Sequence, residues 1–405
     1  MSGGGGIRES EVVCLLLREV MRHHLIQLAI VVAYVGKLTS RKRRSVGSAS
    51  TYGKISRMPT QGRHLGRLIG ENDIDCISNL RMDRNTFGRL CHILRDRGGL
   101  RDGDYVLVEE QVAMFLSVLA HHKKNRVVGF DFWRSGQTIS RYVHAVLGAV
   151  LRLHETFLSK PEAVRDDCTD ARWQWFKGCL GALDGTYVSV LVSNTDKPRY
   201  RTRKGEISTN ILAVCDRNLQ FVYALSGWEG SASDSRILRD ALNRPHGLKV
   251  PKGNYYLADN GYANCEGFLT PFKGVRYHLK EWGPLAARPQ NKEELFNLRH
   301  SKARNVIERA FGILKMRWGI LRSNTFYPIK SQNRLIMSCF LLNNFIRKEM
   351  TVDPVELQFD SMDEPNDGVG ADHEEFVQTT ESSPQWNAKR EELADEMWLQ
   401  YLNTN

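Results

Sequence analysis

The sequence predicts an α/β domain preceded by a helical domain. Apolar residues recur at helical spacing between residues 71 and 165, and apolar, β-branched runs replace this pattern from about residue 170. A long helix is expected again over residues 302–318. The 405 residues, 41% hydrophobic and 25% charged, suffice for two modest domains and their connecting segments.

Residues 1–60 are expected to form a basic, flexible leader. The apolar run at 25–35 has 11 residues and includes Gln27, whereas a membrane span needs about 20 apolar residues. We therefore expect no membrane segment. A signal peptide also fits poorly, because Gly-rich sequence and two acids precede the apolar runs. The basic cluster at 41–44 is typical of a nuclear import signal or a phosphate-binding arm, and a plain solvated charge run is the alternative.

Residues 61–168 are expected to form a helical region. A first apolar segment at 77–94 ends before Gly98 and Gly99, and a second helix is expected over 109–122. After a basic turn, a third helix begins near Ser135. The second helix, the short turn and the third helix, which begins with polar residues, form a candidate helix-turn-helix. The alternative is a helical hairpin with a purely structural role. The groove-facing side chains would be Gln137, Ser140, Arg141 and His144.

From about residue 170, short apolar runs alternate with helical segments. Strands are expected at 181–191, 208–215, 219–225 and 255–258, with a hairpin at Asp216-Arg217-Asn218. A helix is expected at 234–242, and a loop-rich insertion at 260–301 precedes the long helix. This order indicates a mixed α/β sheet, although the pattern alone does not select one fold.

Three carboxylates stand where apolar elements end. Asp184 interrupts a strand built for burial, Asp259 follows the run at 255–258, and Glu308 lies on a polar stripe of the long helix beside the space left by Gly312. Buried acids need a cation or hydrogen-bond donors. Mg²⁺ favours carboxylate oxygens, so the three acids suit a metal site. The alternative is that the aspartates cap turns and Glu308 pairs with Arg304.

Four sequence blocks around these acids closely resemble the DDE nuclease domain of the PIF/Harbinger transposase superfamily. They are residues 181–186 (GALDGT), 228–236 (WEGSASDSR), 257–262 (LADNGY) and 304–318 (RNVIERAFGILKMRW). The resemblance covers about residues 176–347 and extends to domesticated plant relatives of the antagonist-of-like-heterochromatin-protein group.

That resemblance implies an RNase H-like, mixed-sheet nuclease domain at 169–350. Asp184, Asp259 and Glu308 would bind Mg²⁺ or Mn²⁺ and catalyse DNA strand cleavage, with Asp234 and Arg236 supporting the site from nearby. Further phosphate contacts would be Arg304, Lys315 and Arg317, although as solvated surface charges they would need no such role.

Charge is divided unevenly along the chain. The net charge is +11, but residues 351–405 hold 14 acids and two bases, so residues 1–350 carry +23. The basic body predicts salt-sensitive DNA binding. An acidic linker is expected at 351–385, and a C-terminal helix at 386–405 offers an apolar face to a partner. The eight scattered cysteines indicate neither a zinc finger nor a disulfide framework.

The resemblance also implies a nuclear protein that works with a separate Myb-like DNA-binding partner, and it leaves oligomerisation open. We expect no membrane association and no small-molecule organic cofactor. Three functions are compatible with the sequence. The first is a metal-dependent DNA endonuclease of the Harbinger transposase type, favoured by intact acids at all three positions. The second is a domesticated, non-cutting nuclear chromatin or transcription partner, and the third is a DNA-binding adaptor whose nuclease domain is a scaffold.

Overall fold

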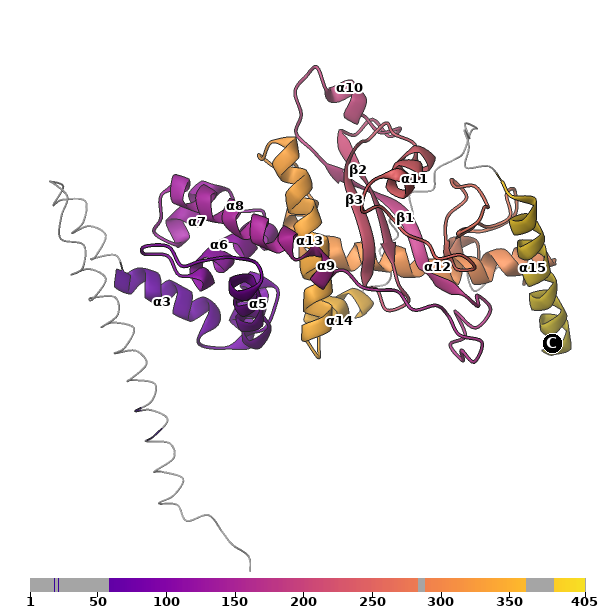
Figure 1. Ribbon diagram of the computed structural model, residues 1–405, viewed down its shortest axis with the longest axis horizontal. Coiled ribbons are helices and arrows are strands. Elements are labelled where there is room, and N and C mark those ends of the chain that lie inside the picture. The colour runs from indigo at the N-terminus through magenta and orange to yellow at the C-terminus, as the bar shows by residue number, and fades with distance from the viewer. Residues whose placement is uncertain (1–17, 19–20, 22–57, 283–287, 362–381, 405) are drawn as a thin grey trace, which may run out of the picture. The chain divides into compact units, whose positions relative to one another are not determined.

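The computed structural model describes residues 18, 21, 58–282, 288–361 and 382–404 (Figure 1). The basic cluster at 41–44 and most of the expected leader lie outside these residues. None of the described helices is long and apolar enough to cross a membrane.

The expected helical region is confirmed. Its helices are α3 (Met58–Ile69), α4 (Asp73–Leu80), α5 (Arg84–Asp96), α6 (Val108–His121), α7 (Asn125–Asp131), α8 (Gly136–Arg152) and α9 (His154–Phe157). The apolar segment at 77–94 is two helices rather than one. Arg81 ends α4 in a left-handed conformation with φ of 68°, and the Asp83 side chain accepts a hydrogen bond from the backbone N–H of Thr86 to start α5.

The turn before α8 differs from the expectation, because it contains a further helix, α7. The short connection therefore joins α7 to α8, and not α6 to α8. The start of α8 is as expected. The Ser135 hydroxyl accepts a hydrogen bond from the backbone N–H of Thr138 at 3.2 Å, so it caps the helix.

The expected mixed sheet is present, with strands in the order β3-β2-β1-β4-β5. The strands are β1 (Cys179–Ser189), β2 (Ser208–Cys215), β3 (Phe221–Glu229), β4 (Tyr255–Leu257) and β5 (Phe268–Leu269). β1, β2 and β3 pair antiparallel, which confirms the hairpin at 216–218, whereas β4 runs parallel to both β1 and β5. This mixed five-stranded sheet after a helical region is the fold expected for an RNase H-like DDE domain.

Helices flank the sheet in the second half of the chain. They are α10 (Lys197–Tyr200), α11 (Asp234–Asn243), α12 (Lys292–Arg317), α13 (Ile329–Glu349), α14 (Pro354–Ser361) and α15 (Pro384–Thr404), with short 3₁₀ turns η1 (Leu279–Trp282) and η2 (Gly319–Leu321). α12 begins well before residue 302, because the Asn291 side chain accepts a hydrogen bond from the backbone N–H of Glu294. β5 and the first turns of α12 thus occupy part of the expected loop at 260–301.

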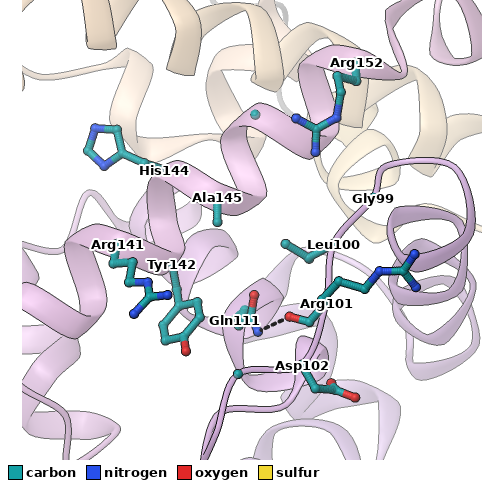
Figure 2. A pocket seen from close by; sticks show the side chains of 12 residues that line it. Gly99, Leu100, Arg101, Asp102, Gln111, Arg141, Tyr142, His144, Ala145 and Arg152 are labelled. Atoms are coloured by element: carbon teal, nitrogen blue, oxygen red, sulfur yellow. Dashed lines mark hydrogen bonds between the residues drawn. The ribbon is translucent and has the colours of Figure 1, made fainter.

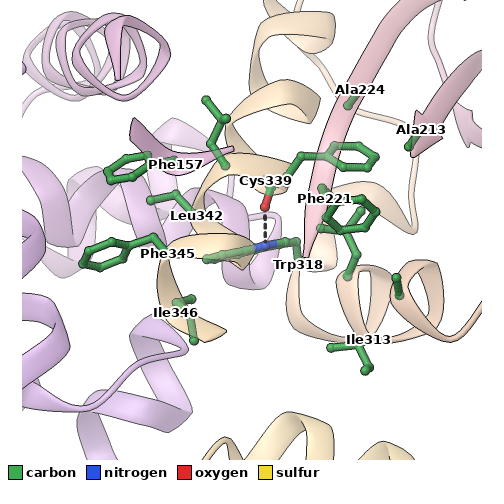
Figure 3. Close-up of a cluster of buried hydrophobic side chains, with 14 of the residues drawn as sticks. Phe157, Ala213, Phe221, Ala224, Ile313, Trp318, Cys339, Leu342, Phe345 and Ile346 are labelled. Carbon is green, nitrogen blue, oxygen red and sulfur yellow. Dashed lines mark hydrogen bonds between the residues drawn. The ribbon is translucent and has the colours of Figure 1, made fainter. Parts of the chain in front are cut away.

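A layer of aromatic side chains joins α12 and α13 to the sheet (Figure 3). The Phe221 ring of β3 lies 6.1 Å from the Phe311 ring of α12 and 4.6 Å from the Phe340 ring of α13. Just after α12, the indole N–H of Trp318 donates to the carbonyl of Cys339 on α13 at 3.1 Å. This packing fixes α12, which holds Glu308, against the strands that hold the aspartates.

The acidic segment at 351–385 begins with a docked helix rather than a linker. A Cβ built on Gly312 would lie 2.5 Å from Cζ of Phe359, so the space beside Glu308 on α12 is filled by a ring of α14. The C-terminal helix α15 also packs on α12, with Ala394 and Met397 buried. Its apolar face is therefore used within the chain, although Leu399 stays exposed.

Candidate active site

The register of the sheet places Asp184 and Asp259 at the same level. β1 and β4 are adjacent parallel strands, and Ala182 is paired with Leu257. Asp184 comes two residues after Ala182, and Asp259 comes two residues after Leu257. Parallel neighbours advance in step, so Asp184, midway along β1, and Asp259, just past the end of β4, lie at the same level.

Glu308 approaches these aspartates through Arg304, one turn earlier on α12. One guanidinium nitrogen of Arg304, Nη1, donates to Oδ2 of Asp184 at 2.7 Å, and the other, Nη2, donates to a carboxylate oxygen of Glu308. Its Nε donates to the Tyr277 hydroxyl at 2.8 Å. The alternative pairing of Glu308 with Arg304 is thus present, but the same arginine also bridges to Asp184.

Asp259 is the acid whose protonation is most perturbed. Burial and the neighbouring Asp184 carboxylate raise the pKa of Asp259 to about 7, although Arg304 acts in the opposite direction. Its Oδ1 accepts a hydrogen bond from the backbone N–H of Gly261 at 2.8 Å. A fraction of Asp259 is therefore neutral near pH 7 as long as no further cation stands beside it.

Asp234, the first residue of α11, is a fourth carboxylate of this cluster. Its charge also raises the pKa of Asp259. A Cβ built on Gly185 would lie 3.0 Å from Oδ1 of Asp234, so the glycine after Asp184 lets α11 approach the strand. The Asn210 side chain on β2 donates to the same oxygen at 3.0 Å. The expected place of Asp234 beside the site is consistent with this geometry.

The donor chemistry of the cluster fits a hard divalent cation. Asp184, Asp234, Asp259 and Glu308 bring four carboxylates against the single guanidinium of Arg304. Three nearby buried oxygens, on the side chains of Asn210, Asn260 and Tyr262, have no hydrogen-bond partner within the described part of the chain. An excess of negative charge and of oxygen acceptors is the environment that Mg²⁺ or Mn²⁺ satisfies.

The acids are nevertheless not yet arranged around one point. Within residues 58–282, 288–361 and 382–404, no three His, Cys, Asp or Glu side chains form a ready metal-binding group. The physical reason is Arg304, whose guanidinium stands between Asp184 and Glu308. Direct ligation by both acids requires this side chain to give up at least one of its two ion pairs.

Two of the expected phosphate contacts are corrected by the structure. Arg317 is fully buried at the end of α12, where it pairs with Asp353 and donates to the Asn343 side chain at 3.0 Å. Arg304 is 7% exposed, and its guanidinium donates hydrogen bonds to Asp184, Glu308 and Tyr277. Neither guanidinium reaches the surface, so neither contacts a DNA phosphate in this arrangement.

The other expected DNA-contacting residues lie outside the acid cluster. Lys315 is half-buried two turns after Glu308 on α12. Arg236 is exposed on α11 and stacks over the Trp228 ring at 5.2 Å. On α8, Gln137 and Arg141 are exposed and Ser140 is half-buried. Their contacts with DNA stay predictions.

Sequence reasoning missed the residues that complete the cluster. Tyr262 and Tyr277 lie in the 260–301 insertion that was expected to be loop, and Asn210 lies inside a fully buried strand. Burial, followed by the charges of Asp234 and Asp259, raises the pKa of the Tyr262 hydroxyl well above its usual range. Only the four-residue spacing of Arg304 and Glu308 gave a signal, and it indicated one of the two ion pairs.

Comparison with known protein families agrees with this geometry. Residues 183–344 match the family described as DDE superfamily endonuclease, and residues 59–152 match a family described only as a domain of unknown function. No solved structure matches the chain. The matched nuclease segment begins just before Asp184 and includes Asp259 and Glu308.

Curated relatives are similar at a low level of identity. An Arabidopsis thaliana protein named ALP1-like is 24% identical over 318 residues, covering 70% of this chain and 74% of its own length. The Arabidopsis protein named antagonist of like heterochromatin protein 1 is 25% identical, covering 66% and 71%. Rat HARBI1, named as a candidate nuclease, is 26% identical and covers 52% of this chain and 59% of its own length. Residues 183–344 of the chain therefore match the DDE superfamily endonuclease family, and the chain is similar to the ALP1-like, antagonist of like heterochromatin protein 1 and HARBI1 proteins.

Proposed function

We propose that this chain is a divalent-metal-dependent DNA endonuclease that uses Asp184, Asp259 and Glu308. The observation that supports the proposal most is the placement of the acids. Asp184 on β1 and Asp259, just past the end of the adjacent parallel strand β4, stand at the same level, and Glu308 faces them from α12. An unrelated set of surface acids would not meet around a buried arginine beside the central strand of a sheet.

The carboxylates of Asp184, Asp259 and Glu308 would hold Mg²⁺ or Mn²⁺. When bound, such ions activate the attacking oxygen and stabilise the leaving oxygen of a phosphodiester. Asn210 on β2 holds α11 beside the cluster, because its side-chain amide donates a hydrogen bond to Asp234 at the start of that helix. Arg304 orients Asp184 and Glu308 until the ion replaces its charge. Asp259 must lose its proton to act as a ligand, so ion binding is coupled to proton release.

A second candidate function is that of a non-cutting nuclear chromatin partner that retains the fold. The observation that favours it is again Arg304, which forms ion pairs with both Asp184 and Glu308 and so offsets part of their negative charge. One relative, the antagonist of like heterochromatin protein 1, carries a chromatin-related name. A nuclear location and a separate Myb-like DNA-binding partner are further proposals that rest on the family resemblance, and the basic body supports DNA as the common ligand.

Metal titration and DNA nicking with one set of variants separate the two functions. The full chain is titrated with Mn²⁺ by calorimetry and incubated with supercoiled DNA, next to an Asp184→Asn/Glu308→Gln double variant. Asp166→Asn, at a side chain that is 89% exposed, is the matched control. Metal binding and nicking that are lost only in the double variant support the nuclease. Metal binding without nicking favours the chromatin partner, and equally weak metal binding by wild type and double variant refutes the site.

A further inference from the structure

The helical region that matches a domain of unknown function contains a basic pocket. A cavity of about 370 Å³ lies between one face of α8 and the loop that joins α5 to α6 (Figure 2). The cavity lies within the range of small-molecule and group-binding sites, roughly 300–1,000 Å³. Its lining includes three arginines, Arg101, Arg141 and Arg152, together with His144.

The loop is attached to α8 at both of its ends. At one end, Arg152 donates to the carbonyl of Gly98 through Nε at 3.0 Å and through Nη2. At the other end, a Cβ built on Gly103 would lie 2.9 Å from Cζ of Tyr142, so the backbone of the loop rests directly against this ring. The loop between these two contacts forms one wall of the cavity.

The charge of the pocket is not neutralised from within. No ion pair of Arg101, Arg141 or Arg152 with a carboxylate is present in the described part of the chain. The pocket's one acid, Asp102, is engaged elsewhere, since it accepts from Arg95 at 3.2 Å and from the backbone N–H of Val108 at 2.8 Å. Three guanidinium groups that lack a carboxylate partner favour an anionic ligand.

A buried side chain completes the inner wall. Gln111 is fully buried and donates through Nε2 to the carbonyl of Arg101 at 2.9 Å and to that of Val106 at 3.1 Å, which fixes the backbone from which the Arg101 side chain extends. Its Oε1 has no hydrogen-bond partner among the described residues. A water that donates both to this oxygen and to a phosphate oxygen would satisfy it.

We propose that this pocket binds a backbone phosphate of DNA, so that α8 and the 98–103 loop hold the nucleic acid by its chain rather than by its bases. The proposal rests on DNA as the ligand of the chain, and it changes the expected role of α8. Arg141 was expected to read a groove as part of a helix-turn-helix, but here it lines the same cavity as Arg101 and Arg152. Phosphate contacts position a protein on DNA without reading its sequence.

Substitutions at one small residue test the pocket without removing any of its contacts. Ala145 is exposed on the lining face of α8. Ala145→Glu introduces a negative charge into the cavity, whereas Ala145→Gln introduces nearly the same volume without charge. Arg141→Gln removes one guanidinium. Arg97→Gln, at an exposed arginine of the same helical region outside the pocket, is the matched control.

The measurement is fluorescence anisotropy of two unrelated DNA duplexes with the full chain in EDTA, over a range of salt concentrations. Because the assay involves no metal and no cleavage, it tests DNA binding by the pocket even if the protein proves not to be a nuclease. We expect Arg141→Gln to weaken binding of both duplexes about tenfold and to lower the slope of log affinity against log salt by about 0.9. Ala145→Glu should weaken binding more than Ala145→Gln, and Arg97→Gln should leave the slope unchanged.

Three results would overturn the proposal. The first is binding by Arg141→Gln and Ala145→Glu that equals that of the Arg97→Gln control. The second is a loss that differs between the two duplexes, which would assign α8 to base recognition. The third is saturable binding of inorganic phosphate that Ala145→Glu abolishes but that leaves the affinity for DNA unchanged at matched ionic strength, which would make free phosphate the ligand.

Discussion

Replacement of Arg304 by glutamine removes the one guanidinium that, among the described residues, stands between the acids of the cluster. In the wild type this group is buried and bonded to Asp184, Glu308 and Tyr277. Removing one partner of a buried ion pair costs about 3–5 kcal/mol. The Glu308 side chain is 46% exposed and so contributes little, which places the expected loss near the lower limit, about 3 kcal/mol.

That loss has a measurable thermal signature. At roughly 2–4 °C per kcal/mol for a domain of this size class, the Tm of Arg304→Gln in EDTA should fall by about 6–12 °C. Mn²⁺ should then raise the Tm of the variant more than that of the wild type, because the ion supplies the missing positive charge without first displacing an arginine. Stabilisation of about 2.7 kcal/mol is reached at a free ion concentration one hundred times Kd.

Arg309→Gln is the matched control on the same helix. Arg309 pairs with Asp360 near the surface, with a third of its side chain exposed, so its loss should cost less than about 1 kcal/mol and leave the response to Mn²⁺ unchanged. The reasoning fails if Arg304→Gln melts within a degree or two of the wild type in EDTA. It also fails if Mn²⁺ stabilises the variant and the wild type equally.

Three further predictions concern neighbouring features. The pKa of Asp259 is raised to about 7, so the apo protein should lose stability as pH rises from about 4 to 7. In EDTA, the Tm of Asp259→Asn should depend less on pH over this range than the Tm of the wild type. Parallel curves of Tm against pH for the two proteins would contradict the assignment. Arg317→Met should lower the free energy of unfolding by about 3–5 kcal/mol in urea denaturation, since it leaves the buried Asp353 without its partner, and it should not alter the salt dependence of DNA binding. Gly312→Ala should destabilise the fold by about 1–3 kcal/mol, because its methyl group meets the Phe359 ring; a Phe359→Ala background should remove this penalty, and a penalty that persists there would place the clash elsewhere.

Asp259 and Glu308 stood out in the sequence because the first follows an apolar run and the second lies on the polar stripe of a helix, whereas Asp184 stood out as a charge inside a run built for burial and lies midway along β1. The strand at 208–215 was likewise readable, since the turn at 216–218 sets its end, and the start of α11 at Asp234 was placed correctly although the Ser233 side chain makes no capping hydrogen bond. The role of Arg304 could not be read in full. Its contact with Glu308 is local, but its contact with Asp184 joins residues 120 positions apart and depends on how α12 packs against β1.

Two further features could not be predicted from the sequence, for identifiable reasons. α13 is buried without interruption from Ser338 to Ile346, so its sequence shows no one-sided apolar stripe. The burial of Arg317 depends on Asp353, which lies in a segment whose acidic composition favoured a linker. In both cases the deciding information is tertiary packing, which overrides local pattern.

The long helix α12 has a mechanical consequence for the whole protein. Its 26 residues span about 39 Å, and its last carbonyl, on Arg317, accepts a hydrogen bond from Nε of Arg81 in the helical region at 3.1 Å. Two residues on, a Cβ at Gly319 would lie 2.7 Å from the carbonyl oxygen of Ala120 on α6. The C-terminal end of the helix that holds Glu308 is thus fixed by contacts with the helical region. A chimera that exchanges the helical region or the nuclease domain with a relative must keep both sides of this contact. Otherwise Glu308 will be misaligned with the aspartates even though every acid is retained.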